Sequence, residues 1–264
     1  AGGRPFRPEA DILALLQAAN RLSLQSGGLF NPTIGKLIDL WGFHADEITV
    51  LTPPDPTAIQ ELLALAPSAA DVVLGDGQLV SRNPAVQYDL GAFAKGYAID
   101  RGIELLQSLG IAHAIINAGG DLRAIGRHGD RPWRIGIRHP RQAGVLASVV
   151  LSEDESIFTS GDYERFFEAS GQRYHHIIDP RTGYPAGQTV SVTVMHRDAA
   201  TADAAATALF VAGPDEWTEV ARRMGIRYVM LIDRDGVVHM NPAMQSRVRF
   251  QTDTPEVRLS KPLS

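Results

Sequence analysis

The alanine-rich segment ADAAAT, residues 202–207, contains two residues whose types and spacing could serve chemistry. Asp203 and Thr207 are four positions apart, so both lie on one face if the segment is helical. A carboxylate and a hydroxyl are hard oxygen ligands that suit Mg²⁺, and the lack of histidine and cysteine in this segment argues against zinc. The same residues also fit a helix that packs through its alanines, with Asp203 near the helix start as a partner of the helix dipole. The segment therefore predicts either a magnesium site or a close helix contact.

The segment DLGAFAKGYAID, residues 89–100, has the residue types of an anion-binding turn. Asp89 ends an expected strand, Gly91 permits a tight turn, and a helix is expected to begin near Ala92. Free backbone N–H groups at a helix start favour anions, and Lys95, one turn later, can point toward the same anion. The spacing differs from that of a Walker A loop. The alternative is that the glycines only make turns and that Lys95 lies in solvent.

The segment HHIIDPRTG, residues 175–183, combines two histidines with an apolar pair and a turn. The preceding residues and the isoleucine pair predict a strand, while Pro180 and Gly183 predict a turn after it. In a strand, His175 and His176 point to opposite faces, so only one of them can face a given site. Taken alone, a strand followed by a turn is the more economical interpretation, because a single histidine is more often a structural residue than a catalyst.

Two further segments give weaker signals. Gly119 and Gly120, in NAGGD, allow close approach of a ligand to the backbone, although a β-bulge explains them equally well. The residues 159–162, Thr-Ser-Gly-Asp, predict a turn that offers hydroxyl groups.

Hydrophobic periodicity and turn residues predict an α+β fold with mostly antiparallel sheets and flanking helices, in a single domain over residues 1–264. A doubly wound parallel sheet is the weaker alternative. Helices are expected over residues 8–28, 55–66, 92–110, 199–213 and 214–225. Hairpins or paired strands are expected over 70–82, 113–126, 132–152 and 226–240, with single strands at 85–89 and 189–196 and an extended tail from residue 252.

Composition excludes several classes of function. The chain has 264 residues, a formal net charge of −5 and no cysteine. The charge argues against a nucleic-acid-binding surface, although it allows a nucleotide bound together with a metal ion. Disulfides, thiolate nucleophiles and cysteine-ligated metals are excluded, and no apolar run of about 18 residues predicts a membrane span. The chain begins without methionine and carries no signal peptide, so we expect that an upstream segment is missing.

Six segments in this order resemble the ApbE family of FAD:protein FMN transferases. The segments are SGGLFNPT (26–33), DLGAFAKGY (89–97), NAGGD (117–121), TSGDY (159–163), HHIIDPRTGYP (175–185) and ADAAAT (202–207). Each motif is weak alone, whereas six in order, spread over about residues 10–240, are specific. The family's upstream segment, which carries a further flavin contact, has no counterpart here.

The resemblance implies an activity and a set of site residues. Enzymes of this family cleave the pyrophosphate of FAD with Mg²⁺, attach FMN through a phosphoester to a threonine of an acceptor protein, and release AMP. In this sequence the resemblance assigns FAD contacts to Leu29, Phe30, Asn31, Asp89, Lys95 and Ile178. It assigns Mg²⁺ binding to the carbonyl of Ala92 together with Asp203 and Thr207, and it makes His176 the candidate base. Neutral histidine suits that role near pH 7, with a pH profile that rises near ~6.5 if the imidazole is unperturbed.

The resemblance also implies a location and a partner. Members of the family are usually exported, often as lipoproteins, so we expect a periplasmic or exported protein that contacts the inner membrane only through a possible lipid anchor on the missing segment. The expected partner is an acceptor protein that carries the target threonine, with a respiratory flavoprotein subunit as the favoured candidate and no nucleic acid.

Three alternatives stay open at the level of sequence. A Mg²⁺-dependent FAD pyrophosphatase would use the same residues, with water in place of the threonine, and would yield FMN and AMP. A non-catalytic flavin-binding or carrier protein would bind FAD without releasing AMP. A structural module that binds a partner protein would bind no nucleotide.

Overall fold

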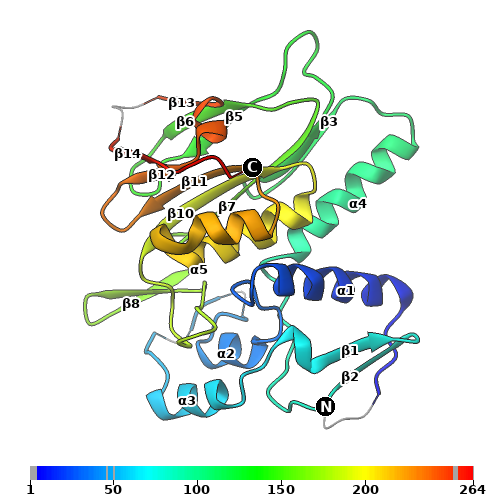
Figure 1. Ribbon diagram of the computed structural model, residues 1–264, viewed down its shortest axis with the longest axis vertical. Helices are drawn as coiled ribbons and strands as arrows, with labels where there is room; N and C mark the ends of the chain where they lie inside the picture. The colour runs from blue at the N-terminus through cyan, green and yellow to red at the C-terminus, as the bar shows by residue number, and fades with distance from the viewer. Residues whose placement is uncertain (1–4, 46, 50, 252–254, 264) are drawn as a thin grey trace.

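A seven-stranded, mostly antiparallel sheet forms the centre of the protein (Figure 1). The computed structural model describes residues 5–45, 47–49, 51–251 and 255–263. In spatial order the strands are β14 (Val257–Leu259), β12 (Val238–Met240), β11 (Tyr228–Asp233), β10 (Thr189–His196), β7 (Asp154–Gly161), β4 (Asp121–Ile125) and β3 (Ala114–Ala118). Only the pairing of β12 with β14 is parallel. The predicted fold class is confirmed, and the prediction of one domain stays a prediction.

Smaller elements surround this sheet. The second sheet has the order β13 (Val248–Phe250), β6 (Val145–Val150) and β5 (Arg134–Arg138), and two hairpins pair β1 (Val72–Gly75) with β2 (Gln78–Ser81) and β8 (Phe166–Ala169) with β9 (Gln172–His175). The helices are α1 (Ala10–Gln25), α2 (Gly35–Leu40), α3 (Pro56–Ala64), α4 (Ala94–Ser108), α5 (Ala199–Arg223), α6 (Pro242–Gln245) and a 3₁₀ turn, η1 (Ala69–Asp71). Among residues 5–45, 47–49, 51–251 and 255–263, no helix is long and apolar enough to cross a membrane.

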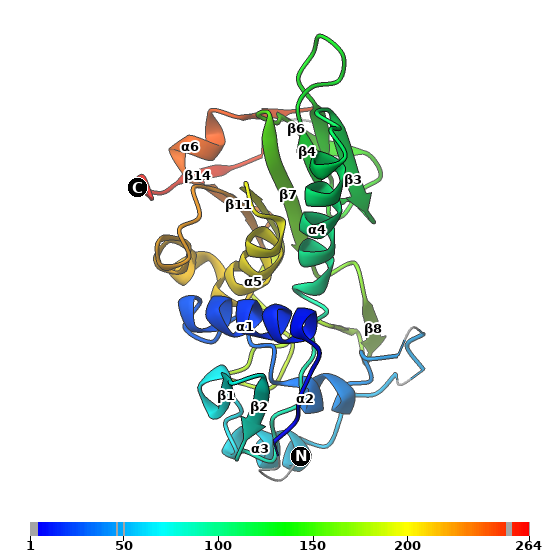
Figure 2. The same ribbon diagram turned by 90° about the vertical axis from the view of Figure 1, so that its right-hand side faces the viewer.

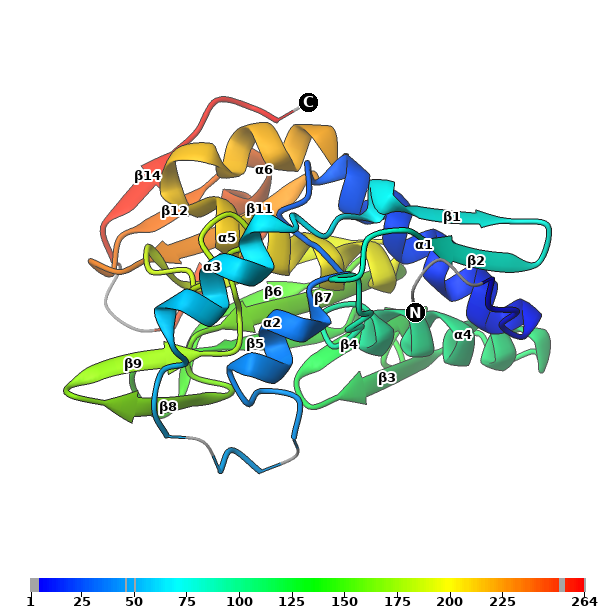
Figure 3. The same ribbon diagram turned by 90° about the horizontal axis from the view of Figure 1, so that it is seen from below.

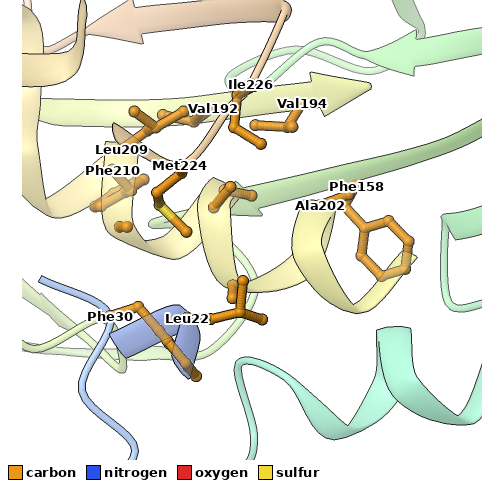
Figure 4. Packing of buried hydrophobic residues seen from close by; sticks show 14 of the residues in the cluster. Leu22, Phe30, Phe158, Val192, Val194, Ala202, Leu209, Phe210, Met224 and Ile226 are labelled. Carbon is orange, nitrogen blue, oxygen red and sulfur yellow. The ribbon is translucent and has the colours of Figure 1, made fainter. Parts of the chain in front are cut away.

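The central sheet is buried on both faces. Val229 and Leu231 of β11 belong to one hydrophobic cluster with α5 and α1, whereas Met230 and Ile232 belong to a second cluster with the three-stranded sheet. Since successive side chains of a strand point to opposite faces, β11 separates helices on one side from a sheet on the other. Figure 4 shows the helical side of this cluster, where Leu209 and Phe210 of α5 lie beside Val192, and Phe30 lies near Leu22.

The long helix α5 lies along this sheet and bends once. The carboxylate of its N-cap residue, Asp198, accepts a hydrogen bond from the backbone N–H of Thr201 at 2.7 Å. Gly213 has a non-helical conformation (φ 70°, ψ −176°) and is followed by Pro214, which divides the element at the boundary between the two predicted helices. The alanines of the first half are almost fully buried, so strand β10 and helix α4 can approach closely.

The crossing of α4 and α5 is one of these close contacts. Figure 2 shows α4 beside β3 and β4, with α5 next to it. A Cβ atom on Gly96 of α4 would lie 2.4 Å from the backbone carbonyl oxygen of Ala199. The Asp100 carboxylate accepts hydrogen bonds from the N–H groups of Ala199 and Ala200 at 3.0 and 2.9 Å and from Arg123 of β4 at 2.6 Å. The start of α5 is therefore fixed against both α4 and β4.

Two predicted elements are wrong. Residues 85–89 form no strand; Gln87 and Asp89 instead bond to the loop at residues 32–35, and this loop takes the place of a sheet neighbour. Of the turn predicted over residues 159–162, residues 159–161 are instead the end of β7, because they pair with β10, and the turn begins at Asp162. At Gly161, the ring of Tyr163 occupies the space where a Cβ would stand.

Two boundaries also differ from prediction. Helix α4 begins at Ala94 rather than near Ala92. Strand β9 ends at His175, so the isoleucine pair that follows lies outside it, with only an isolated bridge from Ile178 to Pro185. The start of the expected extended tail, residues 252–254, lies outside the described residues, and the tail beyond it forms β14.

We predict that Gly96→Ala destabilises the protein, because the added methyl group meets a backbone oxygen that cannot move alone. Overpacking of this kind costs about 1–3 kcal/mol. Gly102→Ala in the same helix is the control: its methyl group meets only the terminal carbon of Ile116, and alanine favours the helix by about 1 kcal/mol. Thermal unfolding measures the stability of both variants. A midpoint for Gly96→Ala that equals or exceeds that of the wild type contradicts the prediction.

Candidate active site

All ten predicted site residues line one cavity of about 930 Å³. They are Leu29, Phe30, Asn31, Asp89, Ala92, Lys95, His176, Ile178, Asp203 and Thr207. Other walls come from α2, β5, the β3–β4 turn and the end of β7, several of which are seen from below in Figure 3. The volume is at the upper end of the usual range for ligand sites, about 300–1,000 Å³. The geometry brings the residues together, whereas their individual roles stay predictions.

The carboxylate of Asp203 is the most perturbed acid of this cavity. It is 6% exposed and accepts a hydrogen bond from the backbone N–H of Gly96 at 2.9 Å. Burial raises the pKa of Asp203 to about 7, because desolvation outweighs both this hydrogen bond and the attraction of Lys95. A bound cation would offset that desolvation. The hydroxyl of Thr207, one helical turn along, lies 3.3 Å from Oγ of Ser160.

The backbone around Asp203 supplies a further oxygen. Gly96 lies in the first turn of α4, where backbone N–H groups have no acceptor within the helix, and its N–H donates to Asp203 instead. We find no hydrogen bond to the Ala92 carbonyl in the part of the chain that the structure describes. A carboxylate, a hydroxyl and an unpaired carbonyl are all hard oxygen ligands, so these residues fit Mg²⁺.

Histidine and cysteine do not contribute to this oxygen set. Over the described ranges, 5–45, 47–49, 51–251 and 255–263, no group of three or more His, Cys, Asp or Glu residues is placed to hold a metal ion. The magnesium prediction thus rests on a single carboxylate, which leaves several positions for water and for oxygen atoms of a substrate.

Lys95 is held at the cavity wall by Asp121, a residue that the prediction missed. The ammonium group forms an ion pair with one oxygen of Asp121, and the other oxygen accepts from the N–H of Thr159 at 2.8 Å. Burial is the largest influence and opposes the charge of Lys95, but Asp121, together with Asp203 and Glu164, outweighs it, so the pKa of Lys95 is raised and the ammonium stays charged. The motif NAGGD contained the signal, since its last residue is the only acid beside the paired glycines.

His176 lies in the cavity wall as a neutral imidazole. Its Nδ1 is 3.2 Å from the carbonyl oxygen of Arg165, so Nδ1–H donates and Nε2 keeps the lone pair that a base requires. Burial, reinforced by the neighbouring His175, lowers the pKa of His176 to about 4. The expected value near 6.5 for an unperturbed imidazole is therefore too high, although the expectation of a neutral side chain at pH 7 holds.

His175 points to the other side, as predicted. Its Nε2 lies 2.9 Å from the carbonyl oxygen of Ala186, its ring meets Phe210 edge-on at 5.4 Å, and it does not line the cavity. The turn at residues 180–183 is also confirmed, with Gly183 at φ 75°. The carbonyl of Gly183 accepts from the indole N–H of Trp41 at 2.8 Å, which anchors the turn to the aromatic cluster behind His176.

Two predicted contact residues have side chains that are already engaged. The Asn31 amide donates to the carbonyl of Pro67 at 2.9 Å and accepts from Thr33, so it holds its own loop in place. The Asp89 carboxylate accepts from the N–H of Gly91 at 2.8 Å and lies 3.0 Å from Nδ1 of His44. Each can contact a ligand through its backbone or its remaining lone pairs.

Proteins of known structure share the fold of this chain. The crystal structure of an ApbE protein from Thermotoga maritima superimposes with a TM-score of 0.86 at 34% identity, over 93% of this chain and 80% of that one. The apo form of the Pseudomonas stutzeri flavinyl transferase ApbE gives a TM-score of 0.80 at 32% identity, over 96% and 79%. In fold, the chain therefore belongs to the same class as these ApbE proteins.

Sequence comparison places the chain more narrowly. The FAD:protein FMN transferase of Rhodobacter capsulatus is 44% identical over 252 residues, and that of Treponema pallidum is 37% identical over 266 residues. Each match covers 94% of this chain, but this chain spans 47% of the first relative and 73% of the second. The ApbE family model matches residues 1–230, and the chain belongs to the ApbE family.

We predict that Asp203→Asn makes the metal-free protein equally or more stable at pH 7.5. The amide oxygen can still accept from Gly96, and the cost of a buried charge disappears. Between about pH 4 and pH 7 the folded wild type binds more protons than the unfolded chain, so its stability falls as pH rises, and the variant loses this slope. Thermal unfolding in EDTA across that range measures it. A large loss of stability at all pH values contradicts the assignment of a strained, metal-ready carboxylate.

Proposed function

We propose that the protein transfers FMN from FAD to a threonine hydroxyl of an acceptor protein, with Mg²⁺, and releases AMP. The observation that carries the proposal is the oxygen set of Asp203, Thr207 and the unpaired Ala92 carbonyl, in one cavity with a charged lysine and a neutral histidine. Membership of the ApbE family and the names of its relatives support the same reaction.

Different residues of the cavity have different roles in the transfer. Mg²⁺ would supply neutralisation of charge on the phosphate oxygens. Lys95 adds a second positive charge beside the pyrophosphate, and its ion pair with Asp121 keeps it extended toward the cavity. Nε2 of His176 takes the proton of the threonine hydroxyl as its oxygen bonds to the FMN phosphorus. The bond from that phosphorus to the AMP oxygen breaks, and AMP leaves with the electron pair.

The lining of the cavity also matches the chemistry of a dinucleotide. Its lining changes from apolar at Leu29, Phe30 and Ile178 to charged at Lys95 and Asp203, as a ligand with an aromatic ring and a pyrophosphate requires. We expect FAD to bind more tightly than FMN or ATP, and calorimetric titration measures this. Equal affinity for ATP contradicts the flavin assignment.

Location and partner are part of the proposal and rest on family membership alone. We infer an exported or periplasmic enzyme that a lipid anchor holds at the inner membrane, with a respiratory flavoprotein subunit as acceptor.

The decisive test is mass spectrometry of threonine-bearing acceptors after incubation with FAD and Mg²⁺. Covalent FMN on the acceptor with equimolar AMP supports the transfer, and a Thr→Ala acceptor is the control. FMN and AMP released at the same rate with and without acceptor would identify a pyrophosphatase instead. Stable FAD binding without AMP would identify a flavin carrier.

His176→Ala is expected to lower the transfer rate by about 10²–10⁴-fold with little change in FAD affinity, because a general base contributes on that order. His175→Ala should instead lower the thermal midpoint, since His175 packs against Phe210 away from the cavity. A larger loss of rate in the His175 variant reverses the assignment.

The wild-type pH profile provides an independent check on the same base. Because the pKa of His176 is lowered to about 4, the imidazole stays neutral down to that value, and protonation removes the base only below it. At saturating Mg²⁺ we expect no imidazole-dependent fall in rate between pH 8 and pH 6. A steep loss centred near ~6.5 would show an unperturbed, solvent-exposed histidine.

A further inference from the structure

Strand β5 is an edge strand that also forms a wall of the cavity. It is the last strand of the three-stranded sheet and pairs only with β6 in the part of the chain that the structure describes. Four consecutive residues, Ile135 to Arg138, line the same cavity as the residues assigned to flavin and metal. None of the six family-like motifs includes this strand.

The free edge of β5 presents unused backbone groups. Leu151 donates to the carbonyl of Trp133 at 2.9 Å, and the antiparallel register continues from Arg134 opposite Val150. Hydrogen-bonded and non-bonded pairs alternate in such a ladder, so the N–H and C=O groups of Arg134 and Gly136 point away from β6. Within the described ranges, these two N–H and two C=O groups form no hydrogen bond with the rest of the protein.

Gly136 leaves this edge open at its centre. It is exposed, its φ is not positive, and the nearest atom that a Cβ would meet is Cγ2 of Val145, itself on an exposed side chain. Backbone strain therefore does not require glycine here. A glycine inside a strand often marks a place where another backbone approaches closely.

The segment around β5 is strongly cationic in an acidic protein. Residues 127–141 contain five arginines, all exposed, and one aspartate, whereas the whole chain has a net charge of −5. Among the described residues, Arg127, Arg131 and Arg134 have no carboxylate within 4.0 Å, and Arg138 reaches Glu164 only at 3.9 Å. These charges oppose pairing with a second copy of the same strand and favour an acidic one.

A second edge strand, β3 of the seven-stranded sheet, also reaches the cavity through Ala118. Its neighbourhood, residues 111–120, contains no arginine, lysine, aspartate or glutamate. The arginines around β5 can therefore attract an acidic partner from solution, whereas the uncharged neighbourhood of β3 cannot.

We propose that β5 is the docking edge for the acceptor: an extended acidic segment pairs with Arg134–Arg138 and brings its threonine into the cavity. Pairing through the backbone supplies affinity without demanding a particular sequence, and the arginines select for acidic residues. The identity of the threonine as the reacting group rests on the proposed function, whereas the docking itself requires no reaction.

Hydrogen–deuterium exchange on the unmodified protein tests the docking without FAD. The probe is a short synthetic peptide with one threonine between alternating valines and aspartates, and its control has lysines in place of the aspartates. We expect the acidic peptide alone to slow exchange of the amides of Arg134 and Gly136. Unchanged exchange, slowing at β3 only, or an equal effect of both peptides overturns the proposal.

A pair of charge reversals gives a second, quantitative test. Arg134→Glu should raise the dissociation constant of the acidic peptide by about 3- to 10-fold. Arg258→Glu, on the edge strand β14 of the large sheet, is a matched control that should leave it unchanged. An equal effect of both reversals overturns the proposal, as does a parallel loss of FAD affinity, which would assign β5 to flavin binding.

The proposed flavin transfer and the proposed docking edge can each be disproved without disproving the other. Acceptor flavinylation with unaltered exchange at β5 removes the docking edge and leaves the transfer intact. Protection of β5 by the peptide without any transfer supports the docking surface and removes the reaction.

Discussion

The hydrogen bond from the backbone N–H of Gly96 to the carboxylate of Asp203 is the contact on which the site depends. It exists because α4 and α5 cross so closely that a side chain at residue 96 would collide with the start of α5. The same bond satisfies a free N–H group in the first turn of α4 and orients a buried acid there. A single close approach of two helices thus assembles an oxygen cluster that neither helix could form alone.

The supports of this crossing lie outside the cavity. The carboxylate of Asp100 receives the first two N–H groups of α5, and Arg123 joins it to β4 and, through Asp154, to β7. All of these groups are charged or polar and largely buried, so each depends on the others for its hydrogen bonds. Their effect is to hold the register of α4 on α5, and with it the separation between Lys95 and Asp203.

Sequence reasoning predicted what depends on local pattern and missed what depends on register between segments. The spacing of Asp203 and Thr207 placed them on one helix face, and the alternation of His175 and His176 placed them on opposite sides. The motif NAGGD marked Asp121 as an acid beside paired glycines, but its pairing with Lys95 could not be read locally, because that ion pair joins α4 to a distant strand. Likewise, residues 85–89 have the composition of a strand, but the loop that binds their backbone is far away in sequence.

The charges of the cavity explain why substrate and metal would have to act together. Its lining has four carboxylates, Asp89, Asp121, Glu164 and Asp203, against three cations, Lys95, Arg138 and Arg165, while His176 is neutral. A pyrophosphate is a dianion, so it would enter a site that already has a slight negative excess. In a partly desolvated cavity such repulsion is strong. A divalent cation on Asp203 reverses the sign of the site, and it also relieves the burial that raises the pKa of that carboxylate. The metal and the flavin nucleotide would then each bind better in the presence of the other.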